Sequence, residues 1–221
     1  MEERKKILVG DKIVDEALEM LQAEADVDLK IGIKQPELEE IISGYDALIV
    51  RSVPLVTKEV LDRGKKLKVV GRAGNGVDNI DLESATRRGV VVVNTPDSNS
   101  FSAGEQTIAL MLASARNLPQ AHQTVKGGGW GRSRYMGSEL YGKTVGIVGL
   151  GRIGSFVATR LKAFQMRVLA YDPYIPLERF KRFGAERIET LNELVRLSDF
   201  ITVHTPKTEE TIGMIGKEQF Q

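Results

Sequence analysis

The sequence predicts an α/β fold in which strands and helices alternate along the whole chain of 221 residues. Short apolar runs of strand length are separated by amphipathic stretches whose apolar residues recur at helical spacing. A glycine-rich turn between one such strand and a helix is typical of nucleotide-binding α/β proteins. Strands that alternate with helices favour parallel sheets covered on both faces. With 42% hydrophobic and 28% charged residues, the composition is that of an ordinary globular protein.

The first part of the chain is expected to form one α/β lobe. Its predicted strands are Lys6–Gly10, Val27–Ile31, Ala47–Arg51, Leu67–Gly71 and Val90–Val93. Between the first two, Val14, Leu18 and Leu21 recur at the spacing of a helix face. Pro36 stands where a helix begins. Three glycines stand where helices should end, namely Gly44, Gly64 and Gly89.

The polar segment at positions 94–100, Asn-Thr-Pro-Asp-Ser-Asn-Ser, is the best candidate for a domain boundary. We therefore expect one lobe at residues 1–97 and a second at 98–221. Directly after the boundary, Ser102 and Glu105 have the spacing of a capping box for the apolar helix around Ile108–Arg116. A loop rich in glycine and basic residues is expected from Lys126 to Gly142.

A second α/β pattern starts at Lys143. Its predicted strands are Thr144–Val148, Arg167–Tyr171 and Phe200–His204, with a shorter one near Ala185–Ile188. A dinucleotide-binding sheet usually has six strands in two halves. The second lobe is therefore expected to be an incomplete sheet of this kind.

Charge and cysteine content exclude several classes of function. The formal net charge is +1, so no broad cationic field favours nucleic acid or an anionic membrane surface. The absence of cysteine removes disulfides, thiolate zinc sites and cysteine nucleophiles. No apolar run reaches the length of a signal peptide core or a membrane span. We predict a cytoplasmic protein with no metal site.

The strongest motif is a glycine fingerprint at the start of the second lobe. Gly149, Gly151 and Gly154 match the pattern G-x-G-x-x-G directly after an apolar strand and at the start of a helix. The first glycine permits the tight turn, the second lets a pyrophosphate approach the backbone, and the third lets helix and strand pack closely. The helix start offers unpaired N–H groups to phosphates, and Arg152 in its first turn is expected to reach a phosphate oxygen.

Asp172 ends the next predicted strand, 18 residues after Gly154. An acid at about this separation accepts hydrogen bonds from ribose hydroxyls and repels a 2′-phosphate. NAD is therefore the predicted cofactor, in preference to NADP. The alternative is a glycine turn and an exposed aspartate in an unrelated α/β protein. The strand, the helix and the acid together argue against that alternative.

The residues around these motifs resemble a known family. Stretches at four places carry the resemblance: GRAGNGVDNIDLESATRRGVVVVNTPDSNSFSAGEQTIALMLASARNLPQA at 71–121, KTVGIVGLGRIG at 143–154, YDPY at 171–174 and DFITVHTPKTEETIGMIG at 199–216. They are similar to the D-isomer-specific 2-hydroxyacid dehydrogenases and, within that family, most similar to the 3-phosphoglycerate dehydrogenases. The resemblance implies a flavodoxin-like substrate lobe followed by a Rossmann dinucleotide-binding domain. It also implies hydride transfer between a small anionic 2-hydroxy acid and NAD, in a homodimer or higher homo-oligomer.

The same resemblance implies roles for individual residues. It assigns the substrate to four residues, Arg51, Asn75, Gly76 and Arg132, of which Arg132 reaches the neighbouring subunit's site and Asn75 also lies near the nicotinamide. It assigns the cofactor to the fingerprint, to Ile153 beside Arg152, to Asp172, and to the segment His204, Thr205 and Pro206. Without the resemblance, the turn at Gly74–Gly76 is a plain tight turn, and lone arginines on loops are usually solvated.

No catalytic residue is expected in this chain. The family uses an arginine, an acid–base histidine and an orienting glutamate, and its pattern places all three downstream of the His-Thr-Pro segment, beyond residue 221. Of the two histidines, His122 is interpreted as a surface residue, and His204 has no proton-transfer role in the family. The chain by itself is expected to be inactive. Two alternatives remain open: another 2-hydroxyacid dehydrogenase, such as a glyoxylate or hydroxypyruvate reductase, and a non-catalytic NAD-sensing scaffold.

Overall fold

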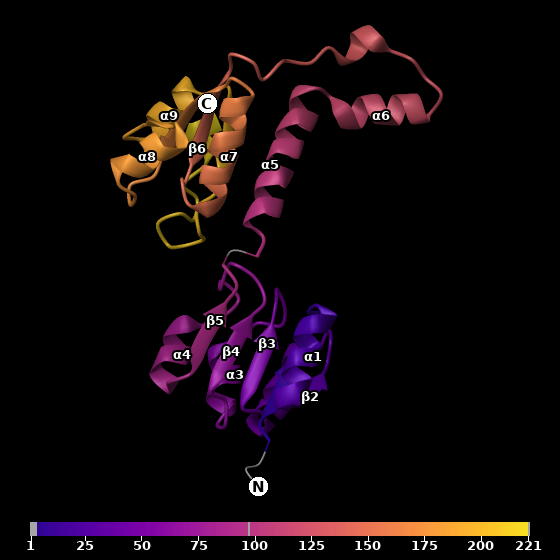
Figure 1. Ribbon diagram of the computed structural model, residues 1–221, viewed down its shortest axis with the longest axis vertical. Helices are drawn as coiled ribbons and strands as arrows, with labels where there is room; N and C mark the ends of the chain where they lie inside the picture. The colour runs from indigo at the N-terminus through magenta and orange to yellow at the C-terminus, as the bar shows by residue number, and fades with distance from the viewer. Residues whose placement is uncertain (1–3, 97, 221) are drawn as a thin grey trace. The chain divides into compact units, whose positions relative to one another are not determined.

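The chain folds into two compact units, Met1–Asn99 and Ser100–Gln221 (Figure 1). The computed structural model describes residues 4–96 and 98–220. The division between the units falls inside the polar segment 94–100, where the sequence predicts a boundary. Asp97 of that segment lies outside the described residues. Each unit has its own sheet and its own hydrophobic core.

The first unit contains a parallel sheet of five strands in the order β2-β1-β3-β4-β5. The strands are β1 (Lys6–Val9), β2 (Asp26–Leu29), β3 (Ala47–Val50), β4 (Val69–Arg72) and β5 (Val91–Asn94). This is the flavodoxin-like strand order, in which ligands bind at the carboxyl edge near the switch point. The predicted strands are confirmed with shifted ends. Arg51 was predicted as the last residue of a strand, but it follows β3.

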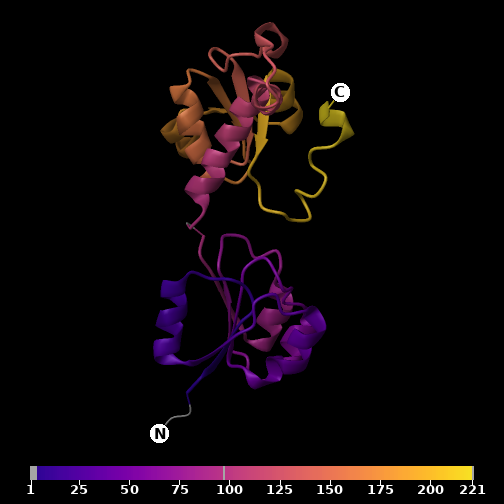
Figure 2. The same cartoon turned by 90° about the vertical axis from the view of Figure 1, so that its right-hand side faces the viewer.

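Helices cover the first sheet unevenly (Figure 2). They are α1 (Asp15–Glu24), α2 (Gln35–Ile41), the short 3-10 helix η1 (Ile42–Gly44), α3 (Lys58–Arg63) and α4 (Leu82–Arg88). Helices α2, α3 and α4 pack on one face, over a core that includes Leu8, Leu48 and Val70. Helix α1 lies on the other face and has no buried residue. The helix ends predicted at Gly64 and Gly89 are confirmed, since these residues are the C-caps of α3 and α4, whereas Gly44 is the last residue of η1.

The second unit begins with α5 (Ser100–Ala115) and α6 (Leu118–Lys126). The predicted capping box at Ser102 and Glu105 is wrong, because α5 already begins at Ser100 and both residues lie inside it. A capping box requires its serine at the non-helical residue that precedes the first turn. The predicted loop from Lys126 to Gly142 contains one 3-10 turn, η2 (Arg132–Tyr135).

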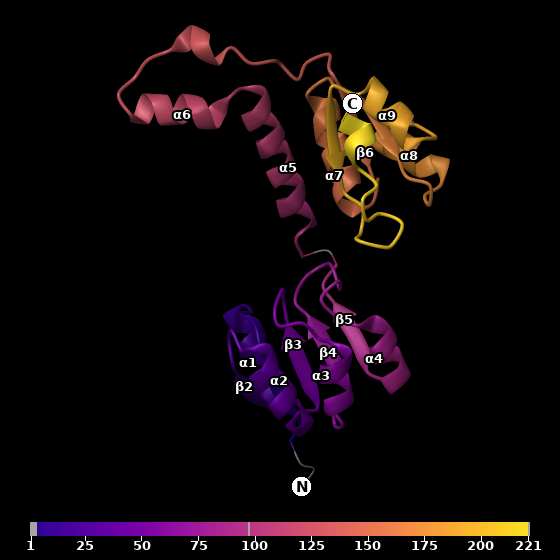
Figure 3. The ribbon, with the colours of Figure 1, turned by 180° about the vertical axis from the view of Figure 1, so that it is seen from behind.

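A parallel sheet of four strands in the order β8-β7-β6-β9 forms the centre of the second unit. Its strands are β6 (Thr144–Val148), β7 (Arg167–Tyr171), β8 (Glu186–Arg187) and β9 (Phe200–Val203). Helices α7 (Arg152–Ala163) and α8 (Leu177–Phe183) share a core with α5. Helix α9 (Leu191–Leu197) packs in a separate cluster, and η3 (Lys217–Phe220) follows in the chain (Figure 3). The strand order matches one half of a dinucleotide-binding sheet plus the first strand of the other half.

Helix α5 is joined to the second unit by aromatic packing against α7. The rings of Phe101 and Phe156 meet edge to face, with centroids 5.0 Å apart. A methyl group at Gly104 would overlap the Phe156 ring, so the helices approach closely only because this position has no side chain. The guanidinium of Arg160 covers the Phe156 ring at 2.9 Å from its centroid. Helix α5 therefore packs as part of the second unit.

Candidate functional site

Backbone geometry explains why the first and third positions of the fingerprint, in the turn after β6, are glycine. Gly149 has φ +90°, in the region that favours glycine. A methyl group there would also lie 3.0 Å from the His204 carbonyl. A methyl group at Gly154 would overlap the Gly149 carbonyl oxygen, so α7 can pack on the turn only with glycine at this position. Both glycines are required by the fold.

The second glycine has a different explanation. Gly151 has φ −69°, which any residue can adopt, and a methyl group there would meet no atom within 4 Å. It is the N-cap of α7 and, as a glycine, supplies no side chain to cap the helix. The first N–H groups of an α-helix lack intrahelical partners and carry partial positive charge. The space beside Gly151 therefore fits an anionic group that approaches the backbone, as the diphosphate of a dinucleotide does.

Asp172 lies beside this turn, as its position in the sequence predicted. It follows β7, and its Oδ2 accepts a hydrogen bond from the Leu150 N–H at 2.9 Å. Its Oδ1 accepts another from the Tyr174 N–H at 3.1 Å. Each carboxylate oxygen has two lone pairs, so both oxygens keep acceptor capacity. The Asp172 carboxylate can therefore accept further hydrogen bonds, such as those that ribose hydroxyls donate. Its contact with a ribose stays a prediction.

His204 is fixed at the end of β9 by its backbone and its ring. Its N–H donates to the Val148 carbonyl at 2.8 Å. Its Nε2 lies 2.9 Å from the Thr202 Oγ1, at hydrogen-bond distance. Burial lowers the pKa of His204 below its ordinary value of 6.5, because desolvation disfavours the charged ring. The imidazole is therefore neutral near pH 7.

The residues after His204 lie next to the first glycine of the fingerprint. A methyl group at Gly149 would be 3.1 Å from the Thr205 Cγ2. The Pro206 carbonyl accepts a hydrogen bond from the Thr211 hydroxyl at 2.6 Å, which closes the loop that follows. The structure thus brings the His-Thr-Pro segment and the glycine turn together, although they are far apart in the sequence.

Two residues at this turn were missed by sequence reasoning. The Leu150 carbonyl accepts hydrogen bonds from the Ser155 hydroxyl at 3.0 Å and from the Arg179 Nε at 3.0 Å. The Arg179 Nη2 also lies 3.5 Å from the Ser155 Oγ. Ser155 is within the helix that the fingerprint opens, but Arg179 comes from α8, 29 positions from Leu150. No local sequence pattern identifies a contact of this separation.

In the first unit, Arg51 lies at the carboxyl edge of the sheet beside Asp11, which follows β1. The Asp11 carboxylate accepts backbone hydrogen bonds from Lys12 at 2.7 Å, Ser52 at 3.0 Å and Val53 at 3.4 Å. Partial burial raises the pKa of Asp11, but these N–H groups and the Arg51 charge outweigh burial and lower it below the ordinary value. Asp11 therefore remains an anion that orders the segment after Arg51.

Asn75 and Gly76 lie in the turn after β4. The Asn75 carbonyl accepts a hydrogen bond from the Asn94 side-chain amide at 2.7 Å, which ties this turn to the end of β5. A methyl group at Gly76 would lie 2.7 Å from the Asp78 Oδ1, so the turn is compact. Both predicted residues therefore share the carboxyl edge of the sheet with Arg51, where ligands bind in such folds.

Arg72 is a further arginine at this edge that sequence reasoning missed. It ends β4, and its Nε is buried with no hydrogen-bond partner among the described residues. The neighbouring Asn79 is 8% exposed, and its amide donates to the Arg51 carbonyl at 3.3 Å. Arg51 and Arg72 thus follow or end adjacent parallel strands at the carboxyl edge of the first sheet.

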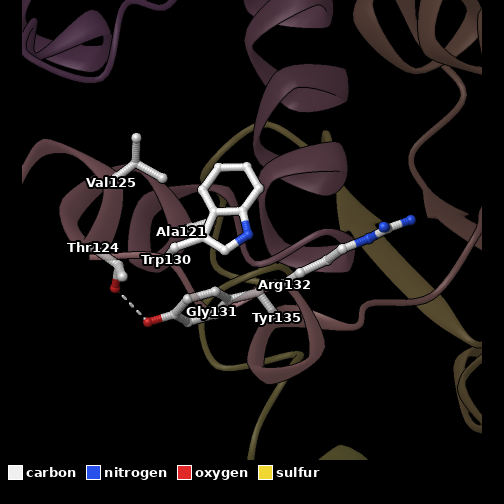
Figure 4. Close-up of a pocket in the computed structure, with 7 residues that line it drawn as sticks. All are labelled: Ala121, Thr124, Val125, Trp130, Gly131, Arg132 and Tyr135. Carbon is white, nitrogen blue, oxygen red and sulfur yellow. Dashed lines mark hydrogen bonds between the residues drawn. The ribbon is translucent and has the colours of Figure 1, made fainter. Parts of the chain in front are cut away.

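Arg132 lies elsewhere, in a hollow of about 200 Å³ built from α6 and the segment after it (Figure 4). The lining residues are Ala121, Thr124, Val125, Trp130, Gly131, Arg132 and Tyr135. The hydroxyls of Thr124 and Tyr135 are hydrogen-bonded, and Trp130 is 84% exposed. The structure therefore does not bring Arg132 to the glycine turn.

Two groups of predicted residues emerge, one in each unit. The second unit joins the fingerprint, Arg152, Ile153, Asp172 and the His-Thr-Pro segment around one turn. The first unit joins Arg51, Asn75 and Gly76 at one sheet edge. That the two groups form a single site stays a prediction. Among residues 4–96 and 98–220, no helix has the length and apolarity needed to cross a bilayer.

Comparison with known proteins identifies the family. The family model for the NAD binding domain of D-isomer specific 2-hydroxyacid dehydrogenases matches residues 108–221, more than half of the chain. The chain belongs to this family. NAD is therefore the cofactor of the second unit, and its binding at the open backbone of Gly151 stays a prediction.

Individual members of the D-isomer specific 2-hydroxyacid dehydrogenase family are similar over nearly the whole chain. D-3-phosphoglycerate dehydrogenase of Methanocaldococcus jannaschii is 50% identical over 97% of this chain, which spans 41% of that protein's length. A crystal structure of a Thermus thermophilus protein is 32% identical, with a TM-score of 0.87 over 97% of this chain and 69% of that one. D-lactate dehydrogenase from Aquifex aeolicus, complexed with NAD and lactic acid, is 28% identical, with a TM-score of 0.83 over 97% of this chain and 64% of that one.

Proposed function

We propose that this chain carries the substrate lobe, at residues 1–97, and the cofactor domain, at 98–221, of an NAD-dependent oxidoreductase. Its reaction is on the CH–OH group of a D-2-hydroxy acid. The observation that carries this proposal is the open backbone at Gly151 beside the Asp172 carboxylate. Gly151 and the start of α7 receive the diphosphate, and Asp172 binds the ribose hydroxyls. When bound, NAD supplies the nicotinamide that accepts a hydride from C2 of the substrate.

The proposed substrate is 3-phosphoglycerate, which the reaction converts to 3-phosphohydroxypyruvate at the start of serine biosynthesis. Curated relatives at 45–50% identity carry the name D-3-phosphoglycerate dehydrogenase. Arg51 and Arg72 supply two guanidinium groups at one sheet edge, and such planar forks pair with phosphate or carboxylate oxygens. The backbone N–H groups of the turn at Asn75 and Gly76 can hold the other acidic group.

Within these 221 residues, we assign binding and orientation but no proton transfer. The His204 ring is engaged with Thr202 and is neutral because burial lowers its pKa. His122 lies on α6, in the same helix that lines the Arg132 hollow. A catalytic acid–base histidine must reach the substrate hydroxyl and titrate near the working pH. Neither histidine is proposed for that role, and the chain alone is expected to bind NAD without turnover.

The proposal is tested by titrating NADH and NADPH into the purified chain and following heat. We expect NADH to bind more tightly than NADPH. The unfolding temperature is then measured with 3-phosphoglycerate, D-lactate and glycolate. We expect 3-phosphoglycerate to raise it more than the other two acids. No NADH binding would exclude the proposed cofactor site. Appreciable NAD reduction with any of these acids would show that catalytic residues lie within the chain.

A second candidate substrate follows from one structural neighbour. A glyoxylate reductase from Paecilomyes thermophila is 25% identical, with a TM-score of 0.88 over 99% of this chain. Glyoxylate or hydroxypyruvate would then replace the phosphorylated acid. Stabilisation by these two compounds but not by 3-phosphoglycerate would favour this candidate.

We further propose a homodimer or higher homo-oligomer in the cytoplasm, with small molecules as the only other ligands. Support comes from large apolar side chains that are more than half exposed along α5, α6 and the following segment. They are Leu110, Leu118, Val125, Trp130 and Met136. Where such side chains together form one exposed patch, the patch marks a contact with another protein. In such an assembly, Arg132 would reach the other copy. Sedimentation of the chain and of Trp130→Ser tests this, since a monomeric unsubstituted chain would exclude it.

A further inference from the structure

We propose that Arg179 on α8 is a positioning residue for the dinucleotide site, an inference that rests on the proposed role of the glycine turn. Its guanidinium does not need to touch the cofactor. It acts on the Leu150 carbonyl, which accepts the Arg179 Nε–H at 3.0 Å. This bond sets the direction in which the next backbone N–H, that of Gly151, points.

The Leu150–Gly151 peptide bond is planar. In a trans peptide the carbonyl oxygen and the following N–H point to opposite sides. When Arg179 and Ser155 hold the Leu150 carbonyl on one side, the Gly151 N–H must point to the other. The Leu150 N–H is itself held by Asp172 at 2.9 Å. Residue 150 is thus fixed at both of its peptides, and the turn is ordered before any ligand arrives.

The direction of this peptide matters for an anionic ligand. Backbone N–H groups attract a diphosphate, whereas a carbonyl oxygen turned toward it would repel it. A rotation of the Leu150–Gly151 peptide would exchange the two groups. The bond from Arg179 opposes that rotation, and a hydrogen bond with a charged donor is about twice as strong as a neutral one.

Helix α8 is well placed to hold Arg179 rigidly. The next residue, Phe180, is fully buried in the core of the second unit. Leu150 is fully buried in the same core, so the donor and the acceptor are anchored by one packed cluster. The Nη2 of Arg179 also approaches the Ser155 Oγ, at 3.5 Å. Ser155 is 3% exposed and donates to the same carbonyl.

The chain contains a matched control for this role. Arg179 and Arg182 lie on the same helix, and each guanidinium is 5.5 Å from the centroid of the Phe183 ring. Replacing either arginine removes one positive charge and one cation–π contact at the same distance from the ring. Only the replacement of Arg179 removes the bond to the Leu150 carbonyl. A difference between the two replacements therefore reports on the contacts that Arg179 alone makes, with the Leu150 carbonyl and the Ser155 hydroxyl.

The experiment measures NADH binding to the 221-residue chain by calorimetry, for the unsubstituted protein, Arg179→Met, Arg179→Lys and Arg182→Met. We expect Arg179→Met to raise the Kd about tenfold, the loss of one charge-assisted hydrogen bond. Arg182→Met should stay within about twofold of the unsubstituted chain. Arg179→Lys should recover part of the affinity, because the ammonium keeps one donor but not the fork. With NADH bound, hydrogen exchange at the Gly151 amide should be faster in Arg179→Met than in Arg182→Met.

The outcomes separate this inference from the proposed function. If the unsubstituted chain binds NADH and Arg179→Met binds equally well, the positioning role is wrong and the cofactor site stands. Equal losses in Arg179→Met and Arg182→Met would assign the effect to charge or packing and would also overturn the inference. If the unsubstituted chain does not bind NADH, both are overturned. Should Arg179→Met fail to fold, Arg179→Lys decides, and an unchanged Kd and Gly151 exchange rate would contradict the role.

Discussion

The Asp172 Oδ2 lies 2.9 Å from the backbone nitrogen of Leu150 and accepts its hydrogen bond. The acid proposed to bind the adenosine ribose therefore also holds the turn proposed to bind the diphosphate. The two parts of the cofactor site are coupled through one carboxylate. Substitutions at this position are expected to change cofactor preference and overall affinity together.

Replacing Asp172 should reveal both roles. Asp172→Ala removes the charge that repels a 2′-phosphate, so we expect the preference for NADH over NADPH to fall about tenfold. It also removes the acceptor for Leu150, so affinity for both cofactors should fall. Asp172→Asn loses the charge but keeps a carbonyl oxygen, and it should lose less NADH affinity than Asp172→Ala. Calorimetric titration of both cofactors measures this, and an unchanged preference in Asp172→Ala would contradict the ribose assignment.

The two glycines of the helix start should respond differently to a single methyl group. Gly151→Ala meets no atom and needs no unusual φ, so its free energy of unfolding should change by no more than about 0.5 kcal/mol. Its methyl group would occupy the proposed path of the diphosphate, and the Kd for NADH should rise at least about tenfold.

Gly154→Ala is the matched comparison. Its methyl group would overlap the Gly149 carbonyl oxygen, which cannot move without displacing α7 from the turn. Overpacking of this kind typically costs about 1–3 kcal/mol of unfolding free energy. Urea denaturation should show the loss. Normal stability in Gly154→Ala, or normal NADH affinity in Gly151→Ala, would mean that the turn differs from the one described.

The His204 ring should titrate below pH 6.5, because burial lowers its pKa. Proton NMR of the imidazole measures this directly, and His122→Gln assigns the signal because the chain has only two histidines. The folded state prefers the neutral ring, so its stabilising contribution is present above pH 6.5 and is lost as the pH falls through the lower folded value. Stability of His204→Asn should therefore depend less on pH in that range. A His204 pKa at or above 6.5 would contradict the described burial.

Tyr45 offers a test at the other end of the pH scale, within the first unit. Burial and its hydrogen bond to Asp28, at 2.7 Å, raise the pKa of Tyr45 to about 12. The folded state then keeps the proton that the unfolded chain loses near pH 10, so this contribution is complete below pH 10 and is lost as the pH rises to about 12.

Tyr45→Phe removes the ionisable group. Its unfolding free energy should fall less steeply than that of the unsubstituted chain between pH 10 and about 12, although it should be lower at pH 7 by about 1 kcal/mol for the lost hydrogen bond. Chemical denaturation at several pH values compares the two. Parallel pH profiles would show that Tyr45 does not titrate as described.

Much of the fold could be predicted from the sequence because its signals are local. Strands such as Thr144–Val148 are continuous apolar runs, and the glycine turn follows one of them directly. The position of Asp172 also follows from strand and helix lengths, so its place beside the turn could be predicted. The helix start at Ser100 could not be predicted, because Ser102 and Glu105 have the spacing of a capping box although both lie inside a helix that begins earlier.

Arg179 and Arg72 were missed because their surroundings come from elements that are not adjacent in the sequence. Arg179 meets Leu150 from another helix, and the buried Nε of Arg72 is recognisable only once β3 and β4 are paired. Periodicity shows which side of an element is buried, but it carries no information about which backbone atom a side chain will reach. Such contacts require the folded arrangement.

The closeness of Gly149 to the His204 carbonyl has a consequence for protein engineering. A chimera that takes its glycine turn from a paralogue must also take the segment after β9 from that paralogue, because the two segments are in close contact. Cofactor redesign therefore has to change the glycine turn and the segment after β9 together. We expect that most variants from a library that randomises only one of the two segments will not pack correctly.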